Sequence, residues 1–256
     1  MAERARLERD GDLGVLVIDN QPLNLFDAEM VRDILAGLDQ TEGCRALLVR
    51  AEGKYFTGGV DVNVFQGLSE SDAAQLTADL LAITHGIEGL PFPTLASVQG
   101  LCLTAGLELS LACDMIWAAE SAQFGLVEAV IALTPLMGGT QRIAERAGPA
   151  RARELVMSGG LYDAATLERW NVVNRVLPEA ELAEKSLRFA QRLASGPTRA
   201  HHATKRIVRA FLEEGVSGAD EATADIGAPL FETDDLRQAV ETFLAEGPGK
   251  ATFNGI

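Results

Sequence analysis

The chain has 256 residues, of which 47% are apolar and 23% charged, and its formal net charge at pH 7 is −15. This composition is typical of a soluble globular protein with one large or two small domains, and the negative charge disfavours a nucleic-acid partner. No apolar run approaches the roughly 20 residues of a membrane span, and the charged start of the chain lacks the apolar core of a secretory signal.

Short apolar segments rich in β-branched residues alternate with helical patterns up to about residue 178. This alternation is typical of an α/β domain whose strands are buried on both faces. Strands are expected at residues 14–18, 46–49, 94–98, 115–118 and 172–176, and helices at about 27–40, 71–88, 106–112 and 139–157.

From about residue 179 the pattern changes to consecutive amphipathic helices, expected at 179–194, 198–214, 217–227 and 233–246. The breaks fall at Gly196-Pro197 and Gly215, and Thr233 or Asp234 is the expected N-cap of the last helix. Four helices in succession cannot all cover one sheet, so we expect some of them to pack on a neighbouring subunit. A helical cap on the same chain is the alternative.

The three cysteines, Cys44, Cys102 and Cys113, are widely spaced, and two of them lie in apolar runs. An odd number of buried thiols fits a reducing cytoplasm better than a disulfide framework. We therefore expect a cytoplasmic protein.

Two turns of small residues could present backbone N–H groups to a ligand. Gly58-Gly59 permits a tight bend that turns the N–H of Val60 outward, although a Gly-Gly pair in a loop is often only structural. The second turn, Thr104-Ala105-Gly106, leads into a helix. If both turns point at one place, the N–H groups of Val60 and Ala105 form an oxyanion hole, which stabilises charge developing on a carbonyl oxygen.

Two glutamates stand in apolar surroundings, Glu108 just after the second turn and Glu128 within residues 124–131. A buried carboxylate is costly unless it is paired or functional, and burial raises its pKa toward the range of general acid/base catalysis. The alternative for Glu108 is an exposed first-turn residue stabilised by the helix dipole.

Four motifs, in order along the chain, resemble those of the crotonase superfamily, the enoyl-CoA hydratase/isomerase group. The resemblance extends over essentially the whole length. The motifs are Asn20-Gln21-Pro22-Leu23-Asn24; Phe56-Thr57-Gly58-Gly59-Val60-Asp61-Val62; Val98-Gln99-Gly100 followed by Ala105-Gly106-Leu107-Glu108-Leu109 and Ala112-Cys113-Asp114; and Gln123-Phe124-Gly125 followed by Glu128, Pro135 and Gly138-Gly139-Thr140-Gln141-Arg142.

This resemblance implies an α/β fold with a crotonase-like ββα spiral core at residues 1–195, which binds acyl-CoA. It also implies a C-terminal helical region at 196–256 that forms a homotrimer, often paired into a homohexamer, and covers the site. The coenzyme A belongs to the substrate, so neither a separate cofactor nor a metal is expected.

The resemblance further implies hydration of a trans-2-enoyl-CoA whose carbonyl lies between the N–H groups of Val60 and Ala105. Glu108 would activate the water that attacks C3, and Glu128 would deliver a proton to C2. The remaining substrate or CoA contacts that the resemblance implies are Gly58, Asp61, Gly106, Phe243 and Lys250.

Departures from the family pattern keep other functions open. Val60 is bulkier than the usual Ala or Gly, and Leu136-Met137 forms an unusual wall of the expected acyl pocket. One alternative is an isomerase that moves a double bond from C3 to C2 with one carboxylate and no water. Another is a non-catalytic homologue that binds acyl-CoA or serves as a scaffold.

Overall fold

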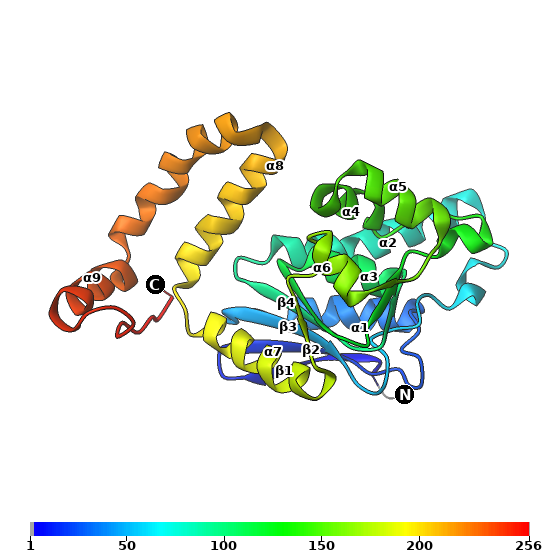
Figure 1. Ribbon diagram of the computed structural model, residues 1–256, viewed down its shortest axis with the longest axis horizontal. Helices are drawn as coiled ribbons and strands as arrows, with labels where there is room; N and C mark the ends of the chain where they lie inside the picture. The colour runs from blue at the N-terminus through cyan, green and yellow to red at the C-terminus, as the bar shows by residue number, and fades with distance from the viewer. Residues whose placement is uncertain (1–2, 256) are drawn as a thin grey trace.

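The computed structural model describes residues 3–255. Helices cover both faces of a six-stranded sheet, and an arm of helices, residues 198–246, extends from one end (Figure 1). The strand order in this sheet is β1-β2-β3-β4-β6-β9, in which β1 is antiparallel to β2 and the later pairs are parallel. These strands are β1 (Ala5–Asp10), β2 (Leu13–Ile18), β3 (Ala46–Ala51), β4 (Thr94–Val98), β6 (Met115–Ala119) and β9 (Arg175–Leu177).

A second, smaller sheet contains β5 (Leu101–Leu103), β7 (Gln123–Gly125) and β8 (Tyr162–Asp163), in the order β5-β7-β8. The helices are α1 (Ala28–Asp39), η1 (Val62–Phe65), α2 (Glu70–Gly89), α3 (Ala105–Ala112), η2 (Glu128–Ile131), α4 (Gly139–Ala147), α5 (Pro149–Ser158), α6 (Ala164–Arg169), α7 (Glu179–Ala194), α8 (Thr198–Gly227), η3 (Ala228–Glu232) and α9 (Asp234–Glu246).

The central strands are buried on both faces, as their apolar sequences predict. Alternate residues of a strand point to opposite sides of the sheet. In β2, Leu16 and Ile18 belong to the core under α1, α2 and α3, whereas Val15 and Val17 belong to the core under α7. On the α7 side, Trp117 stacks on Phe189 with ring centroids 4.5 Å apart. The α/β fold class is therefore confirmed.

Side-chain caps mark the start of several helices. Ser69 and Asp72 form a reciprocal capping box at the start of α2, and Thr233 accepts a hydrogen bond from the Leu236 N–H at the start of α9. Such caps satisfy N–H groups that have no partner within the helix. The expected N-cap at Thr233 is confirmed.

The sequence prediction lacks β1, β7, β8 and α6, and it differs from the structure at three further places. The helix expected over 139–157 is two helices, because Gly148 has φ +85° and Pro149 begins α5. The strand expected at 172–176 is β9 at Arg175–Leu177, although Val172 and Val173 are buried. The short strand β5 stands where we expected only a turn of small residues before the helix.

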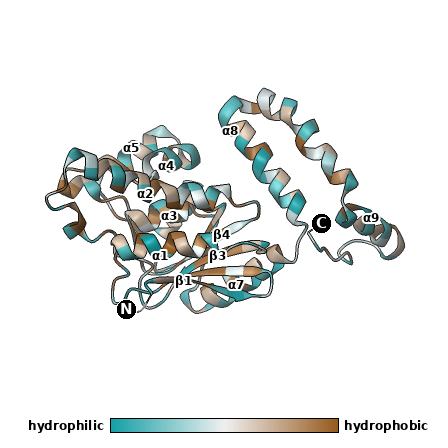
Figure 2. Cartoon of the chain, turned by 180° about the vertical axis from the view of Figure 1, so that it is seen from behind, coloured by the Kyte–Doolittle hydropathy of each residue, from teal (hydrophilic) through white to brown (hydrophobic). Residues whose placement is uncertain are grey.

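The C-terminal helices form an arm that leaves the body after α7 (Figure 1). Within α8, Gly215 has the non-helical angles φ +72° and ψ −170°, which matches the expected break. Large apolar side chains are exposed along the arm, where apolar colouring recurs in Figure 2. They include Val208, Phe211, Leu212, Val216, Phe231, Val240, Phe243 and Leu244.

Candidate active site

Backbone hydrogen bonds hold the two turns together. The Thr57 N–H donates to the Leu101 carbonyl at 2.9 Å, and the Leu103 N–H donates to the Thr57 carbonyl at 3.2 Å. The loop that ends in Gly58-Gly59 therefore runs beside β5, which leads directly into α3. As a result, the peptides at Val60 and Ala105, which are far apart in the sequence, become neighbours.

The Val60 N–H points toward the start of α3. The opposite edge of this segment pairs with Phe26, since the Phe26 N–H donates to the Gly59 carbonyl and the Asp61 N–H donates to the Phe26 carbonyl, both at 2.9 Å. The Val60 N–H donates to the Thr104 hydroxyl at 3.1 Å. Ala105 is the first residue of α3, where an N–H has no carbonyl partner within the helix.

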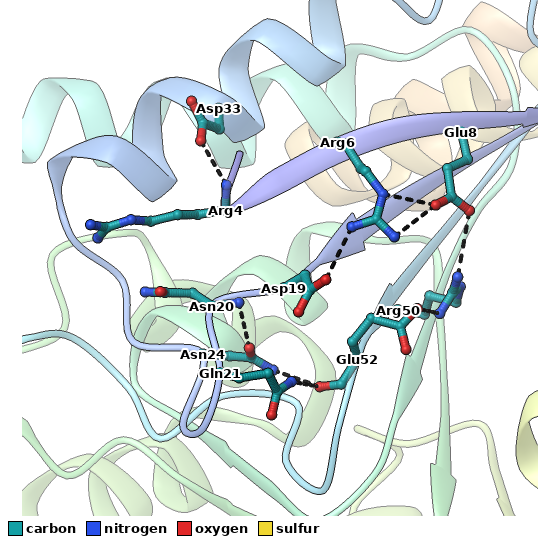
Figure 3. A network of polar contacts seen from close by, with 10 residues as sticks. All are labelled: Arg4, Arg6, Glu8, Asp19, Asn20, Gln21, Asn24, Asp33, Arg50 and Glu52. Atoms are coloured by element: carbon teal, nitrogen blue, oxygen red, sulfur yellow. Dashed lines mark hydrogen bonds and ion pairs between the residues drawn. The ribbon is translucent and has the colours of Figure 1, made fainter. Parts of the chain in front are cut away.

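A buried asparagine fixes the loop that carries the first turn. The Asn24 side-chain amide donates to the Glu52 carbonyl at 3.0 Å, and its oxygen accepts from the Asn20 N–H at 2.7 Å (Figure 3). The same amide donates to the Tyr55 carbonyl at 2.9 Å. Asn24 is fully buried, so these bonds replace the water that its amide would otherwise bind. These bonds explain Asn24 of the first motif, and the Asn20 side chain donates to the Leu25 carbonyl at 2.9 Å.

Glu108 lies in the first turn of α3 and is only 2% exposed. Its Oε1 accepts hydrogen bonds from the Met137 N–H at 2.9 Å and the Gly139 N–H at 2.8 Å. Gly139 begins α4, so the positive end of that helix also faces the carboxylate. The carboxylate of Glu108 is therefore held in one orientation by backbone groups.

Glu128 is the first residue of η2 and is 8% exposed. Its Oε2 is buried and has no hydrogen-bond partner among residues 3–255. An ionised carboxylate is strongly disfavoured without such partners, and burial raises the pKa of Glu128 to about 7. Glu128 is therefore able to hold a proton near neutral pH.

Burial also raises the pKa of Glu108 to about 7, and the negative charge of Glu128 contributes to this rise. The N–H groups of Gly139 and Met137 and the charge of Arg142 act in the opposite direction. Arg142 is itself buried and forms a two-pronged ion pair with Glu88, at 2.7 and 2.6 Å. The two glutamates are thus close enough to interact electrostatically, and both titrate near neutrality.

Known proteins resemble this chain over nearly its whole length. The family model described as enoyl-CoA hydratase/isomerase matches residues 8–254. A Rhizobium meliloti protein named "probable enoyl-CoA hydratase" is 31% identical, over 95% of this chain and 96% of the relative. The chain belongs to the enoyl-CoA hydratase/isomerase family, the crotonases.

Other members of the family have more specific names. A crotonyl-CoA hydratase of Syntrophomonas wolfei is 29% identical, over 98% of each chain, and a carnitinyl-CoA dehydratase of Salmonella typhimurium is 33% identical, over 83% of each chain. The crystal structure of an enoyl-CoA hydratase from Bacillus anthracis has the same fold, with a TM-score of 0.91 at 24% identity, over 99% of this chain and 100% of that chain.

Three other predicted crotonase site residues lie in or beside the two turns. Gly58 donates its N–H to the Leu23 carbonyl at 2.7 Å, and the Asp61 carboxylate caps η1 through the Asn63 N–H at 3.0 Å. Gly106 lies against Thr57, whose methyl group would be 1.8 Å from an added Cβ atom. These residues shape the turns, and their contact with a substrate stays a prediction.

The structure does not bring Phe243 and Lys250 to the two glutamates within one chain. Phe243 is exposed on α9, and Lys250 is exposed beyond its end, across the molecule from α3 (Figure 1). If these residues cover a coenzyme A, as crotonase membership implies, they would have to cover it in another copy of the chain.

Sequence reasoning missed three groups at this site. It did not find the Met137 and Gly139 N–H groups that hold Glu108, or the Thr104 hydroxyl that accepts from Val60. Of the predicted Leu136-Met137 wall of an acyl pocket, the Met137 side chain is fully buried in the main core and Leu136 packs against it. The only available signal was the Gly138-Gly139 pair before a helix, which is typical of an N-terminus that binds an anion.

Among residues 3–255, no helix combines the length and the apolar character that crossing a membrane requires. Within the same residues, His, Cys, Asp and Glu side chains form no group of three that could hold a metal ion.

Proposed function

We propose that this chain is an enoyl-CoA hydratase, which adds water reversibly across the 2,3 double bond of a trans-2-enoyl-CoA. The observation that carries the proposal is the pair of buried glutamates whose pKa values both rise to about 7, next to the paired turns at Val60 and Ala105. A hydratase needs one carboxylate to activate water and one carboxylic acid to protonate carbon. Two carboxyl groups that titrate near neutrality can serve both roles.

The two turns polarise the thioester carbonyl in this mechanism. Hydrogen-bond donors at the start of α3 and at the Gly58-Gly59 turn stabilise the negative charge that grows on the oxygen as C3 is attacked. Each such donor lowers the barrier by roughly 3 kcal/mol. The polarised carbonyl makes C3 electrophilic and C2 able to accept a proton once the enolate has formed.

The glutamates divide the proton transfers. Two N–H groups hold Oε1 of Glu108, which leaves Oε2 to bind a water and take its proton as the water attacks C3. Glu128, whose Oε2 has no hydrogen-bond partner in the described part of the chain, delivers its proton to C2. The reverse reaction exchanges these roles. Relatives named hydratase and dehydratase support water addition and removal over proton shuttling alone.

The proposal includes a homotrimer or a pair of trimers. The exposed apolar residues along α8 and α9 support it, because monomeric proteins rarely leave so many large apolar side chains on one arm. Their burial against neighbouring copies would also bring α9 of one chain near the body of another.

A panel of CoA thioesters tests the function. We expect trans-2-enoyl-CoA substrates to lose the absorbance of the conjugated thioester and to yield 3-hydroxyacyl-CoA, identified by mass spectrometry. We expect Glu128→Gln to abolish this reaction and to bind ligand as the parent does. Conversion of a 3-enoyl-CoA to a 2-enoyl-CoA without a hydroxy product would instead support an isomerase. Tight binding with no turnover across the panel would support a non-catalytic homologue.

A further inference from the structure

Thr104 occupies the N-cap position of α3, but its side chain does not cap the helix. A threonine at this position normally accepts a hydrogen bond from the second or third N–H of its own helix. The Thr104 Oγ1 atom instead accepts from the Val60 N–H, at 3.1 Å, in the turn that lies opposite. The hydroxyl therefore stands between the two turns from which the oxyanion hole would be built.

The backbone at Thr104 has a conformation that suits glycine. Its angles are φ +48° and ψ −119°, a region that a β-branched residue rarely adopts. Backbone bonds fix this peptide, since the Thr104 N–H donates to the Gly125 carbonyl at 2.8 Å and the Thr104 carbonyl accepts from the Glu108 N–H at 3.0 Å. Such strain at a candidate active site indicates that the side chain has a use there.

The hydroxyl has a proton to donate. The Val60 N–H occupies one lone pair of Oγ1, and among the described residues no protein acceptor takes the hydroxyl proton. Thr104 is buried, and the next residue, Ala105, has its N–H at the helix start. A hydroxyl that accepts one hydrogen bond becomes a better donor in the next.

We propose that the Thr104 hydroxyl is a direct donor of the oxyanion hole. It donates to the thioester oxygen together with the Ala105 N–H, and the Val60 N–H behind it orients and polarises it. This assignment rests on the proposed acyl-CoA chemistry and changes one part of it. The contact on the Val60 side is made by the side chain of Thr104, not by the Val60 peptide.

Packing around Gly59 holds the threonine side chain in this place. A Cβ atom added at Gly59 would lie 2.7 Å from Oγ1 and 3.4 Å from Cγ2 of Thr104, so the side chain rests directly on the Gly59 backbone. One of the two alternative staggered rotamers would put the γ-methyl group where the hydroxyl now lies, and a methyl group cannot donate. The hydroxyl is therefore expected to stay when a substrate enters.

The test uses butyryl-CoA labelled with carbon-13 at its carbonyl, which lacks the double bond and cannot be hydrated. Hydrogen bonds to the carbonyl lower its stretching frequency. Difference infrared spectroscopy measures this frequency for the bound thioester. We compare the wild type with Thr104→Val, Thr104→Ser and Thr104→Gly. Thr84→Val is the matched control, because Thr84 is a fully buried threonine of α2 whose hydroxyl bonds to the Leu81 carbonyl at 3.0 Å.

We expect Thr104→Ser and Thr84→Val to keep the frequency shift of the wild type. Thr104→Val should lose at least half of the shift, and its kcat for enoyl-CoA hydration should fall by about 10²–10³-fold with little change in KM. Thr104→Gly relieves the backbone strain, so it should fold even if the valine variant does not. It should also lose shift and kcat.

Other results would overturn the proposal. A full shift in Thr104→Val, or turnover by Thr104→Gly at or above the wild-type rate, would mean that the hydroxyl only covers the Val60 N–H. The absence of any shift in the wild type would also overturn it. A wild type that shifts the carbonyl of butyryl-CoA but hydrates no enoyl-CoA would refute the proposed function alone, and the variants would still decide the role of Thr104.

Discussion

The N–H of Gly139 donates a 2.8 Å hydrogen bond to the carboxylate of Glu108, so the first peptide of α4 holds the acidic residue of α3. The contact requires a close approach of the two helices. It gives a physical reason for the Gly138-Gly139 pair, because a side chain at 139 would collide with the carboxylate that the backbone binds. Glu108 is thus positioned by backbone groups from a separate part of the chain.

Gly139→Ala should therefore disable the site with a modest effect on the rest of the fold. The added methyl group would lie 2.7 Å from Cγ of Glu108 and would push the carboxylate out of place. We expect kcat for enoyl-CoA hydration to fall by roughly 10²-fold, since misplacing a catalytic group by about 1 Å has this effect. Gly89→Ala is the control, because a methyl group there meets no atom within 4 Å and should leave kcat unchanged. Equal rates for the two variants would show that the approach of Gly139 to Glu108 is unimportant.

The rate of hydration should depend on pH in a bell shape with its maximum near pH 7. Below this pH the base Glu108 becomes protonated, and above it the acid Glu128 loses its proton, because burial raises both pKa values to about 7. The two groups interact, so the two apparent pKa values of the profile belong to the pair and not to either glutamate alone. Steady-state kcat/KM measured from about pH 5 to pH 9 tests this. A profile that stays flat over this range would contradict the assignment of the two glutamates as acid and base.

Glu128 should also make the folded protein less stable as the pH rises. Its folded pKa of about 7 lies above the 4.5 of an exposed glutamate, so the folded state binds the proton more tightly. The contribution of Glu128 to the free energy of unfolding is then greatest below pH 4.5. This contribution falls as the pH rises from 4.5 through 7, by up to about 3 kcal/mol.

Glu128→Gln cannot ionise, so this variant should have a higher free energy of unfolding than the wild type at pH 8 but not at pH 4.5. Urea denaturation at the two pH values measures the difference. The same offset between variant and wild type at both pH values would contradict the raised pKa of Glu128.

The arm should mediate assembly. Val216 and Leu244 are 64% and 80% exposed on α8 and α9. A mass of three or six times 27.3 kDa is expected by light scattering, and Val216→Glu combined with Leu244→Glu should lower it to one chain. Met157→Glu is the matched control, because Met157 is also exposed but lies on α5 in the body. A wild type that is monomeric at micromolar concentration would refute this part of the proposal.

Much of the fold could be predicted because its signals are local. Apolar β-branched runs predicted the central strands, and the breaks at Gly196-Pro197 and Gly215 predicted the start and the kink of α8. The two helices α4 and α5 were expected as one, although Gly148-Pro149 carried the signal for a break. The strand β5 is too short to show a periodicity of its own.

The site was less accessible from the sequence because backbone groups make most of its contacts. A sequence shows which carboxylates have apolar neighbours, and this pattern predicted Glu108 and Glu128 as site residues. It does not show where an N–H points. Neither the hydrogen bond from the Met137 N–H to Glu108 nor the one from the Val60 N–H to Thr104 could therefore be predicted. The distance of Phe243 and Lys250 from the glutamates depends on the course of the arm, which no local pattern determines.

The origin of the oxygen in the product tests the central claim most directly. Enoyl-CoA is incubated with the protein in water labelled with oxygen-18, and the CoA thioesters are analysed by mass spectrometry after a brief reaction. We predict a 3-hydroxyacyl-CoA with one oxygen-18 at C3, and no labelled product with Glu108→Gln or Glu128→Gln. A product without oxygen-18, or equal labelling by either variant, would contradict hydration by this pair of glutamates.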